Sequence, residues 1–324
     1  MATNTLLTGT VVRVAEDVED KLYNFRPDDS PLVSAIDRTP ISNTFHEWNR
    51  DFYATPDATN GAIEGADAAN AVVAQPTPLN NRTQIFVKAY SVSNTTEAVK
   101  KYGRKAELSR IKGLRMVEIR RDMEAAVLSS AVSVTGTSGA AGKLRGLFGF
   151  LSTNSILGAG GVAPNPVTNT APTAGTLAAL TEANVKALVL GAYTFGGDCQ
   201  NLYCSPAHKQ KISTAFTGNV ARYQDITVGS KQELVSNVDF YRHDFGVTKV
   251  IPDRVMTGAG AGLINTMFLV DPDKLALGQL RPIETEQMAT TGDAKNFQMR
   301  AEVTLIVRDE APMGAYRDIT ATGS

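Results

Sequence analysis

The chain contains 324 residues, 43% of them hydrophobic and 20% charged, and its 32 basic and 33 acidic side chains give a net charge of −1. This composition indicates a folded globular protein and excludes a disordered or collagen-like chain. The near-zero charge argues against a dedicated nucleic-acid binder and fits a protein that tolerates contact with its own copies. No run of 18 apolar residues predicts a transmembrane helix, residues 1–5 lack the features of a secretory signal, and two cysteines fit a reducing cytoplasm.

The first 40 residues are expected to form an arm rather than part of a core. They carry an acidic run at residues 16–20. Behind this run, residues 31–36 predict one or two helical turns, with Ser30 as the N-cap and Pro31 at the first helical position.

Residues 44–53 and 83–93 are rich in aromatic and β-branched side chains and favour strands. Between them, residues 54–82 consist largely of Ala, Asn, Gly, Thr and Pro, with hardly a large apolar side chain. A connection of this length within a compact domain indicates either function or disorder. We expect an extended hairpin whose tip needs another surface to lie on, and a disordered surface loop is the alternative.

Residues 103–132 predict the longest helix, about 45 Å at 1.5 Å per residue. Residues 104–124 carry 11 charges, seven basic and four acidic, and apolar residues recur between them at helical spacing. The expected ion pairs along this helix are Arg104–Glu107, Glu118–Arg121 and Arg120–Glu124. The interspersed acids favour a solvated or interface face over a phosphate-binding one.

After this helix the chain has two regions of different composition. Residues 135–176 hold nine of the 27 glycines and no acidic side chain, and they predict a loop with an apolar anchor at residues 144–151. From residue 181 onward helices and strands alternate. The expected elements are a helix over 181–192, a strand at 202–204, a helix over 205–216, a hairpin of 235–242 and 247–251, and a buried strand at 267–270.

Residues 297–308 alternate apolar and polar side chains, with Ile306 alone out of step. This pattern predicts a strand of about 40 Å with one buried face. The long helix and the long strand match in length and each has one apolar face. We therefore expect the helix to lie along an antiparallel ribbon.

Catalytic motifs are scarce. His46 has no second histidine at a metal-binding spacing, and Cys199 and Cys204 lack the further cysteine pair of a zinc site. Small buried thiols are one interpretation of the cysteines, and a hydrolase site formed by Cys204, His208 and His243 is the alternative. We expect no catalytic residues, no cofactor and no metal.

Several short motifs occur in the same order as in one known protein family. These motifs are NTFHEW at 43–48, TQIF at 83–86, EAV at 97–99, GRKAEL at 103–108, RRDMEAA at 120–126, SPAHKQ at 205–210, DFG at 244–246, LRP at 280–282, TGDAK at 291–295 and EVTL at 302–305. With them the chain resembles the major capsid, or major head, proteins of tailed bacteriophages, which share the Johnson fold with herpesvirus capsids. The likeness covers about residues 10–320, includes no catalytic motif, and is poor in the Gly-rich stretch at 150–176.

The resemblance implies an α+β fold and a structural protein that self-assembles, as hexamers and pentamers, into an icosahedral or prolate head shell around double-stranded phage DNA. The implied parts are an N-terminal arm (1–40), an extended β-hairpin loop (41–95), a peripheral domain with a long spine helix on long antiparallel strands (96–134 and 280–314), a Gly-rich loop (135–180), an α/β axial domain (181–279) and a tail (315–324).

The resemblance also implies the partners and the location of the chain. The expected partners are further copies of itself, portal and scaffolding proteins, decoration proteins and non-specifically contacted packaged DNA, with no membrane. Assembly is expected in the host cytoplasm, and the product is expected in the virion. A minor or decoration protein of the virion is the alternative to the shell subunit.

The charges are distributed unevenly. Residues 1–99 carry a net charge of −6, residues 100–179 a net of +7 and residues 180–324 a net of −2. We therefore expect acidic arms and loops of one subunit to meet basic spine helices of its neighbours. The candidate subunit contacts are Glu16, Asp17, Glu19, Asp20, Trp48, Glu64, Asp67, Arg104, Lys105, Arg110, Lys112, Arg115, Arg120 and Arg121.

Overall fold

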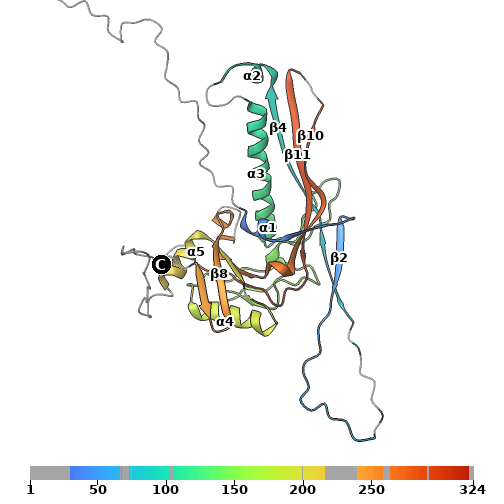
Figure 1. The fold of residues 1–324 in the computed structure, drawn as a ribbon, viewed down its shortest axis with the longest axis vertical. Coiled ribbons are helices and arrows are strands. Elements are labelled where there is room, and N and C mark those ends of the chain that lie inside the picture. The colour runs from blue at the N-terminus through green and yellow to red at the C-terminus, as the bar shows by residue number, and fades with distance from the viewer. Residues whose placement is uncertain are drawn as a thin grey trace, which may run out of the picture.

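The chain is a mixed helix and strand protein with two parts, which we call the spine region and the axial region. The computed structural model describes residues 30–65, 67, 73, 75–101, 106–198, 200–215, 239–257, 263–289 and 292–320. Figure 1 shows the spine region as one upright helix beside a narrow sheet, and the axial region as a compact body near its foot. A long open loop leaves the foot of the spine on the other side.

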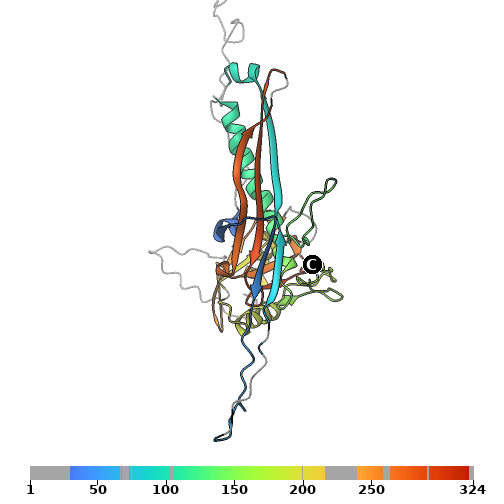
Figure 2. The same ribbon diagram turned by 90° about the vertical axis from the view of Figure 1, so that its right-hand side faces the viewer.

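The spine region confirms the predicted helix on a ribbon. Its sheet has the order β1 (Asp37–Pro40), β10 (Leu275–Gln287), β11 (Ala294–Val307), β4 (Gln84–Ser93). The strand β1 runs parallel to β10, and the other two pairs are antiparallel. The helix α3 (Glu107–Leu128) stands along one face of this sheet (Figure 2). Apolar side chains of both layers form the core between them.

The spine helix ends four residues before the predicted position. It spans 22 residues, or roughly 33 Å at 1.5 Å per residue. Ser129 leaves the helix in an extended conformation, and the chain returns across it at Gly146, where a Cβ would collide with the Ser129 carbonyl. The predicted start at residue 103 lies outside the described residues.

The extended loop is a hairpin, but one of its strands differs from the expected one. The strand β2 (Phe45–Arg50) pairs antiparallel with β3 (Thr77–Arg82), so that Trp48 lies opposite Leu79. The predicted run at 83–93 is instead β4 of the spine sheet. This part of the prediction was wrong because β3 has the polar sequence TPLNNR, which gives no strand pattern.

The strand β11 alternates only in its first half. From Ala301 to Val307 every residue is buried, so the prediction of one buried face is wrong for this half. Its outer face is covered here by the base of the loop hairpin, where Asn81 Nδ2 donates to the Leu305 carbonyl at 2.8 Å. The Thr304 hydroxyl likewise donates to the Arg82 carbonyl at 2.9 Å.

The axial region is built on a six-stranded mixed sheet. Its order is β5 (Ser155–Ile156), β12 (Gly314–Tyr316), β9 (Met267–Val270), β6 (Asn201–Cys204), β8 (Gly246–Pro252), β7 (Phe240–His243). Two helices flank it, α4 (Glu182–Thr194) and α5 (Pro206–Ala215). These elements confirm the predicted helices, strands and hairpin as far as the described residues reach. Thr181 caps α4 as expected, since its side chain accepts a hydrogen bond from Asn184 N.

The Gly-rich stretch is an ordered pair of small hairpins around a buried anchor. Bridges join Val134 to Lys143 and Val162 to Thr173, and residues 144–151 are buried as predicted. Arg145, only 1% exposed, donates to the Pro166 carbonyl and to Asn169 Oδ1, each at 2.7 Å. These bonds hold one hairpin to the other.

Several short helices complete the described chain. They are α1 (Pro31–Ala35), α2 (Asn94–Ala98) and the 3-10 turns η2 (Leu147–Gly149), η3 (Val255–Thr257), η4 (Leu263–Asn265) and η5 (Pro272–Lys274). Among the residues described, none of the helices has the length and apolar character needed to cross a membrane.

Candidate assembly surfaces

The base of the loop hairpin is fastened to the spine by an aromatic side chain. Trp48, partly buried, donates its indole N–H to the Val307 carbonyl at 2.8 Å. Its ring lies 6.0 Å from the ring of the buried Phe150. A large ring with a satisfied N–H fixes both the position and the orientation of β2.

A buried carboxylate fastens the same base a second time. Glu310, 1% exposed, lies 3.2 Å from the Arg50 guanidinium at the end of β2. Its oxygens also accept from the backbone N–H groups of Ser152 and Thr153, each at 3.1 Å, and from the Thr153 hydroxyl at 2.5 Å. Because these donors surround it, the charge of Glu310 can be buried without a large desolvation cost.

Asn81 fastens the second strand of the hairpin. It is fully buried, and its Nδ2 donates to the carbonyls of Arg145 and Leu305, while its Oδ1 accepts from Arg145 N at 2.7 Å. One amide thus joins the hairpin, the Gly-rich stretch and β11. Both strands of the loop therefore begin from positions set by buried hydrogen bonds.

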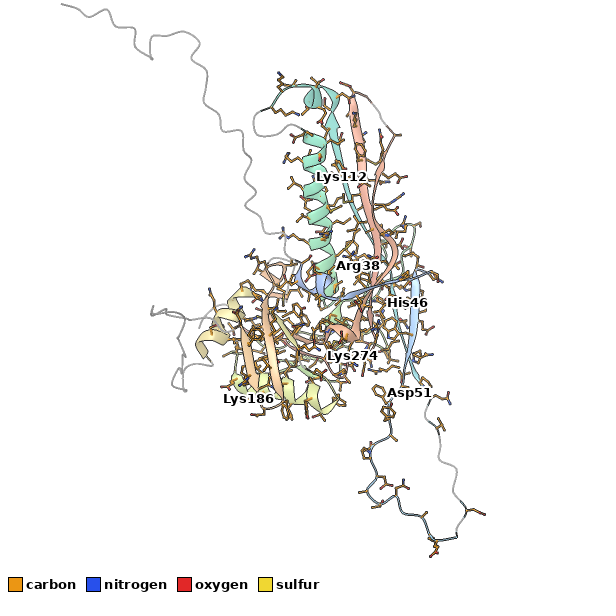
Figure 3. All side chains as sticks on the ribbon, viewed as in Figure 1. Arg38, His46, Asp51, Lys112, Lys186 and Lys274 are labelled. Atoms are coloured by element: carbon orange, nitrogen blue, oxygen red, sulfur yellow. The ribbon has the colours of Figure 1, made fainter. Side chains whose placement is uncertain are left out.

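Beyond this base the loop has no core of its own among the residues described. Every described residue from Asp51 to Gln75 is exposed, including Glu64 and Asp67. The few large apolar side chains stand in solvent, with exposures of 104% for Tyr53 and 81% for both Ile63 and Val73. Figure 3 shows Asp51 at the point where the loop leaves the body. These side chains are therefore available for contact with a second surface.

The spine helix presents basic side chains, and two of the three predicted ion pairs are not found; the third, Arg104–Glu107, involves a residue outside the described part of the chain. Glu107 pairs with Arg110, and Glu118 pairs with Arg115 at 2.6 Å rather than with Arg121. Lys112, near the upper part of the helix in Figure 3, and Arg120 are exposed, and neither makes an ion pair within the described residues. Glu124 does not pair with Arg120, because its carboxylate is buried against α1.

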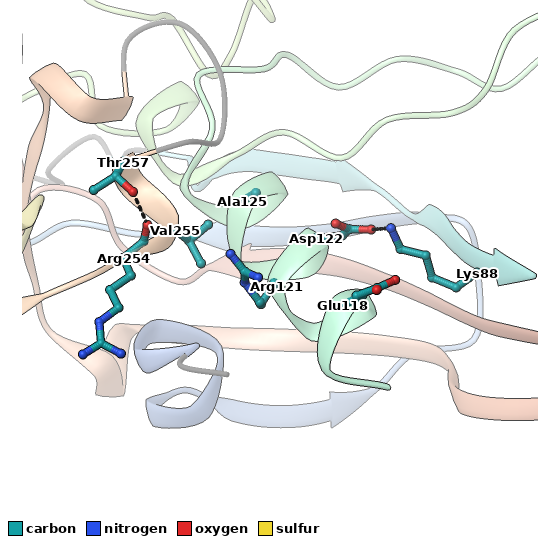
Figure 4. Close-up of a pocket in the computed structure, with 8 residues that line it drawn as sticks. All are labelled: Lys88, Glu118, Arg121, Asp122, Ala125, Arg254, Val255 and Thr257. Atoms are coloured by element: carbon teal, nitrogen blue, oxygen red, sulfur yellow. Dashed lines mark hydrogen bonds and ion pairs between the residues drawn. The ribbon is translucent and has the colours of Figure 1, made fainter. Parts of the chain in front are cut away.

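A charged groove of about 380 Å³ lies where the spine helix meets the η3 turn (Figure 4). Arg121 and Asp122 line it from α3, and Arg254 and Thr257 line it from the turn. Lys88 of β4 is tied to Asp122 at 2.6 Å, as the dashed line in Figure 4 shows. The groove therefore spans the junction of the spine and axial regions.

Exposed aromatic side chains gather on the axial region. Tyr193 of α4 stacks on Phe245 of the β7–β8 hairpin, with 4.4 Å between ring centroids. Both rings are about half exposed, Tyr193 at 52% and Phe245 at 41%, and we call this stacked pair the axial aromatic patch.

Comparison with known proteins shows the family to which the chain belongs. The family model described as "SU10 major capsid protein" matches residues 1–320. The chain belongs to the SU10 major capsid protein family. It is a structural protein of the phage head shell and is located in the virion capsid.

The major capsid protein of Escherichia phage Phieco32 is 27% identical over 252 residues, which cover 65% of this chain and 67% of that protein. Capsid structures share the fold. The structure from Gordonia phage Cozz has a TM-score of 0.62 at 14% identity and covers 99% of both chains. The native GTA particle capsid has a TM-score of 0.63 at 11% identity and covers 99% of this chain and 100% of that one.

The hydrolase alternative gains no support from the structure of this capsid subunit. Cys204 is fully buried, and burial raises the pKa of its thiol to about 12, so the nucleophilic thiolate is not available at neutral pH. His208 is also buried, which lowers its pKa to about 4. His243 lies in the β7–β8 hairpin, where its Nε2 is 3.0 Å from the Thr248 hydroxyl. Within the described residues no group of three or more His, Cys, Asp or Glu side chains is arranged to hold a metal.

The predicted contact residues have different outcomes. Glu16, Asp17, Glu19, Asp20, Arg104 and Lys105 lie outside the described residues. Arg110 and Arg115 are engaged within the helix, whereas Lys112, Arg120, Glu64 and Asp67 are exposed. Trp48 makes an intrachain contact, and its role between subunits stays a prediction.

Sequence reasoning missed the buried polar residues that organise the body. Glu124, Arg145 and Glu310 are 0% to 1% exposed, and each joins segments far apart in the chain. Asp318 does the same, since it accepts from Gly158 N and Gly175 N and so closes the base of the second Gly-rich hairpin. Charged side chains of this kind look like surface residues in a single sequence.

Proposed function

We propose that the shell forms because each subunit lays its loop of residues 51–76 on a neighbouring copy, in hexamers and pentamers around packaged double-stranded DNA. The observation that carries this proposal is the contrast within one hairpin. Its base is held by Trp48, Arg50 and Asn81, while the described residues beyond the base are exposed. A firmly held base presents the tip in a fixed direction, and the tip is completed only by a second surface.

The experiment replaces residues 54–74 by a short Gly-Ser linker. The replaced range stops before β3, whose Leu79 is 1% exposed and lies opposite Trp48, so that the core is left intact. The shortened chain should keep the free energy of unfolding of the parent and give no closed shells by electron microscopy. Replacing residues 137–140, the turn of the first Gly-rich hairpin, is the matched control and should leave shells intact. Closed shells from the shortened chain would contradict the proposal.

Charge complementarity supports a second contact between copies. Residues 1–99 are acidic overall and the segment containing the spine helix is basic. We infer that acidic residues of one arm, Glu16 to Asp20 among them, meet Lys112 and Arg120 of another copy. Lys112→Glu combined with Arg120→Glu should lower shell yield and weaken its dependence on salt, because fewer opposite charges remain to be screened. Lys249→Glu, an exposed charge on the axial sheet, is the control. Equal yields in low and high salt for the parent would contradict the inference.

The axial aromatic patch supports a third contact, between the axial regions of neighbouring copies. Its two half-exposed rings would supply part of the apolar centre that a stable interface requires. Tyr193→Ser with Phe245→Ser should reduce shell yield without unfolding the subunit. Val162→Ser, at a similarly exposed position outside the patch, should leave the yield unchanged. Full shell yield from the double variant would remove the patch from the contact surfaces.

Partners other than further copies of the chain are proposed from its role as a shell subunit. A shell subunit without catalytic work of its own is proposed to contact portal, scaffolding and decoration proteins, and to touch packaged DNA without sequence preference. Assembly is proposed to take place in the host cytoplasm. The measurement is the composition of purified particles by mass spectrometry, in which the shell protein should dominate by mass.

A further inference from the structure

The far part of the loop hairpin contains the dipeptide Asn60–Gly61, which occurs once in the whole sequence. Both residues are exposed, in the open loop that Figure 1 shows leaving the foot of the spine. An asparagine followed by glycine is especially prone to deamidation, because no Cβ hinders the glycine nitrogen from reaching the asparagine side chain. Whether this reactivity is restrained depends on the contacts that the two residues make in the fold.

The turn that contains Asn60 is held by local bonds alone. Asp57 Oδ1 accepts from the Thr59 hydroxyl at 2.6 Å and from Thr59 N at 2.8 Å. Asn60 N donates to the Asp57 carbonyl at 3.4 Å, and Gly61 N donates to the Thr59 carbonyl at 2.6 Å. All of these groups are exposed, so water can replace the backbone bonds. Within the described residues no hydrogen bond holds the side-chain amide of Asn60, which is therefore free to turn toward Gly61.

Asparagines that precede other small residues are restrained by contrast. Asn154, before a serine, is 8% exposed, and its Nδ2 donates to the Leu188 carbonyl at 2.8 Å. Asn94, before a threonine, is exposed, but its Nδ2 donates to Asp293 Oδ1 at 2.6 Å. Asn60 thus combines a following glycine, an exposed position and a side-chain amide that is free to rotate.

We propose that Asn60–Gly61 is a modification site, at which the unassembled subunit converts asparagine to aspartate and isoaspartate without an enzyme, and that assembly protects it. The Gly61 nitrogen, after loss of its proton, attacks Cγ of Asn60. The bond from Cγ to the side-chain nitrogen breaks, ammonia leaves, and a cyclic imide forms. The second part of the proposal, protection by assembly, rests on the loop contact proposed above.

Water then opens the cyclic imide in one of two ways. Attack at Cγ breaks its bond to the Gly61 nitrogen and gives aspartate in the original main chain. Attack at the main-chain carbonyl carbon breaks the other bond to that nitrogen and gives isoaspartate, in which the main chain runs through Cβ and Cγ. The net reaction consumes water and releases ammonia, and it needs neither an oxidant nor a reductant.

Both products change the tip at the place where the proposed contact forms. Residues 51–76 contain four acidic side chains and no basic one, so the new carboxylate, which is ionised at neutral pH, adds to an already acidic segment. Isoaspartate also lengthens the main chain by a methylene group and shifts the residues on its two sides relative to each other. Free subunits therefore lose competence for assembly with age, whereas subunits already in shells keep the original tip.

Peptide mass spectrometry of the full chain, incubated as isolated subunits in neutral and mildly alkaline buffer, tests the site. Trypsin releases residues 51–82 as one peptide, because Arg50 and Arg82 flank a stretch without Lys or Arg. Fragment ions should place the conversion at Asn60, while the fully buried Asn81 of the same peptide stays intact. The rate should rise with pH, since the Gly61 amide must lose a proton. An unaged sample digested in parallel gives the background from digestion.

A substitution at Gly61 gives the matched variant. In Gly61→Ala the added Cβ meets only the Thr59 carbonyl oxygen, at 3.9 Å, so the turn can be kept. Conversion should slow by about tenfold, because the methyl group hinders the approach of the nitrogen. Gly139→Ala, at an open position in the first Gly-rich hairpin, is the control and should convert at Asn60 as the parent does.

Preformed shells test the second part of the proposal. Asn60 should convert more slowly in shells than in isolated subunits, and aged parent subunits should give fewer shells than equally aged Gly61→Ala subunits. Conversion no greater than the digestion background, or equal rates in the parent and Gly61→Ala, would overturn the modification site. Equal rates in shells and isolated subunits would overturn protection by assembly and count against the loop contact. The loop contact itself is tested separately by the shortened chain, which needs no modification at Asn60.

Discussion

The base and the tip of the loop hairpin belong to one continuous segment. The base is held by contacts with the rest of the subunit, whereas the described residues of the tip are exposed. At the base, Trp48, Arg50 and Asn81 are each bonded to residues more than 60 positions away in the chain. At the tip, Tyr53 and Ile63 expose most of their surface. If the tip contacts a neighbouring copy as proposed, stability of the subunit and association between subunits depend on separate residues of the same hairpin.

Removal of the aromatic anchor should have the largest effect on the subunit. Trp48→Ala loses the ring contact with Phe150 and leaves the Val307 carbonyl without its donor. We expect a loss of about 3 kcal/mol in the free energy of unfolding, measured by urea titration. Trp48→Phe should recover part of it. An unchanged midpoint for Trp48→Ala would show that the base is not held as described.

Stability should also depend on pH through the buried acids of the body. Folding raises the pKa of Glu124 from 4.5 to about 8. The contribution of Glu124 to the free energy of unfolding is therefore complete below pH 4.5 and is lost as the pH rises to about 8. Folding lowers the pKa of His208 from 6.5 to about 4. The contribution of His208 to the free energy of unfolding therefore increases as the pH rises from 4 to 6.5, and it opposes the loss from Glu124 in that range. Between pH 6.5 and 8 we expect a net fall of about 2 kcal/mol. Glu124→Gln should remove this fall, because it removes the titrating carboxyl group, and a parent chain equally stable at both pH values would contradict it.

Asn81→Ala should have a somewhat smaller effect. The substitution leaves Arg145 N and the Leu305 carbonyl buried without their partner. We expect a loss of about 1.5 kcal/mol. The matched control is Asn80→Ala on the neighbouring, partly buried position of β3, and an equal loss there would show that Asn81 has no special role.

Changes at the tip should have the smallest effect on the subunit and a large one on assembly. Ile63→Ser combined with Val73→Ser alters two side chains that are 81% exposed, so the free energy of unfolding should stay within about 0.5 kcal/mol. Shell yield by sedimentation should nevertheless fall. A chain that loses stability but still assembles would reverse the assignment of roles to base and tip.

The elements with strong local patterns could be predicted from the sequence, and the contacts between them could not. The spine helix, the axial hairpin and the Thr181 cap follow from periodicity and turn residues. The pairing of β2 with β3 was missed, because TPLNNR is polar and its two buried residues, Leu79 and Asn81, are fixed by tertiary contacts.

Glu124 shows the same limit at a charged position. Its spacing from Arg120 predicts a surface ion pair. In the fold it faces α1 and Asp253, which lie far from it in the sequence. A helical pattern gives the spacing of side chains but not which neighbours will cover them.

The most direct test of the division between base and tip is hydrogen–deuterium exchange of the loop before and after assembly. Amides of residues 51–65 should exchange freely in the isolated subunit and become protected in shells. Amides of β2 and β3 should be protected in both. Loop amides that exchange equally fast in shells and in isolated subunits would contradict the claim that a neighbouring copy supplies the surface on which the tip lies.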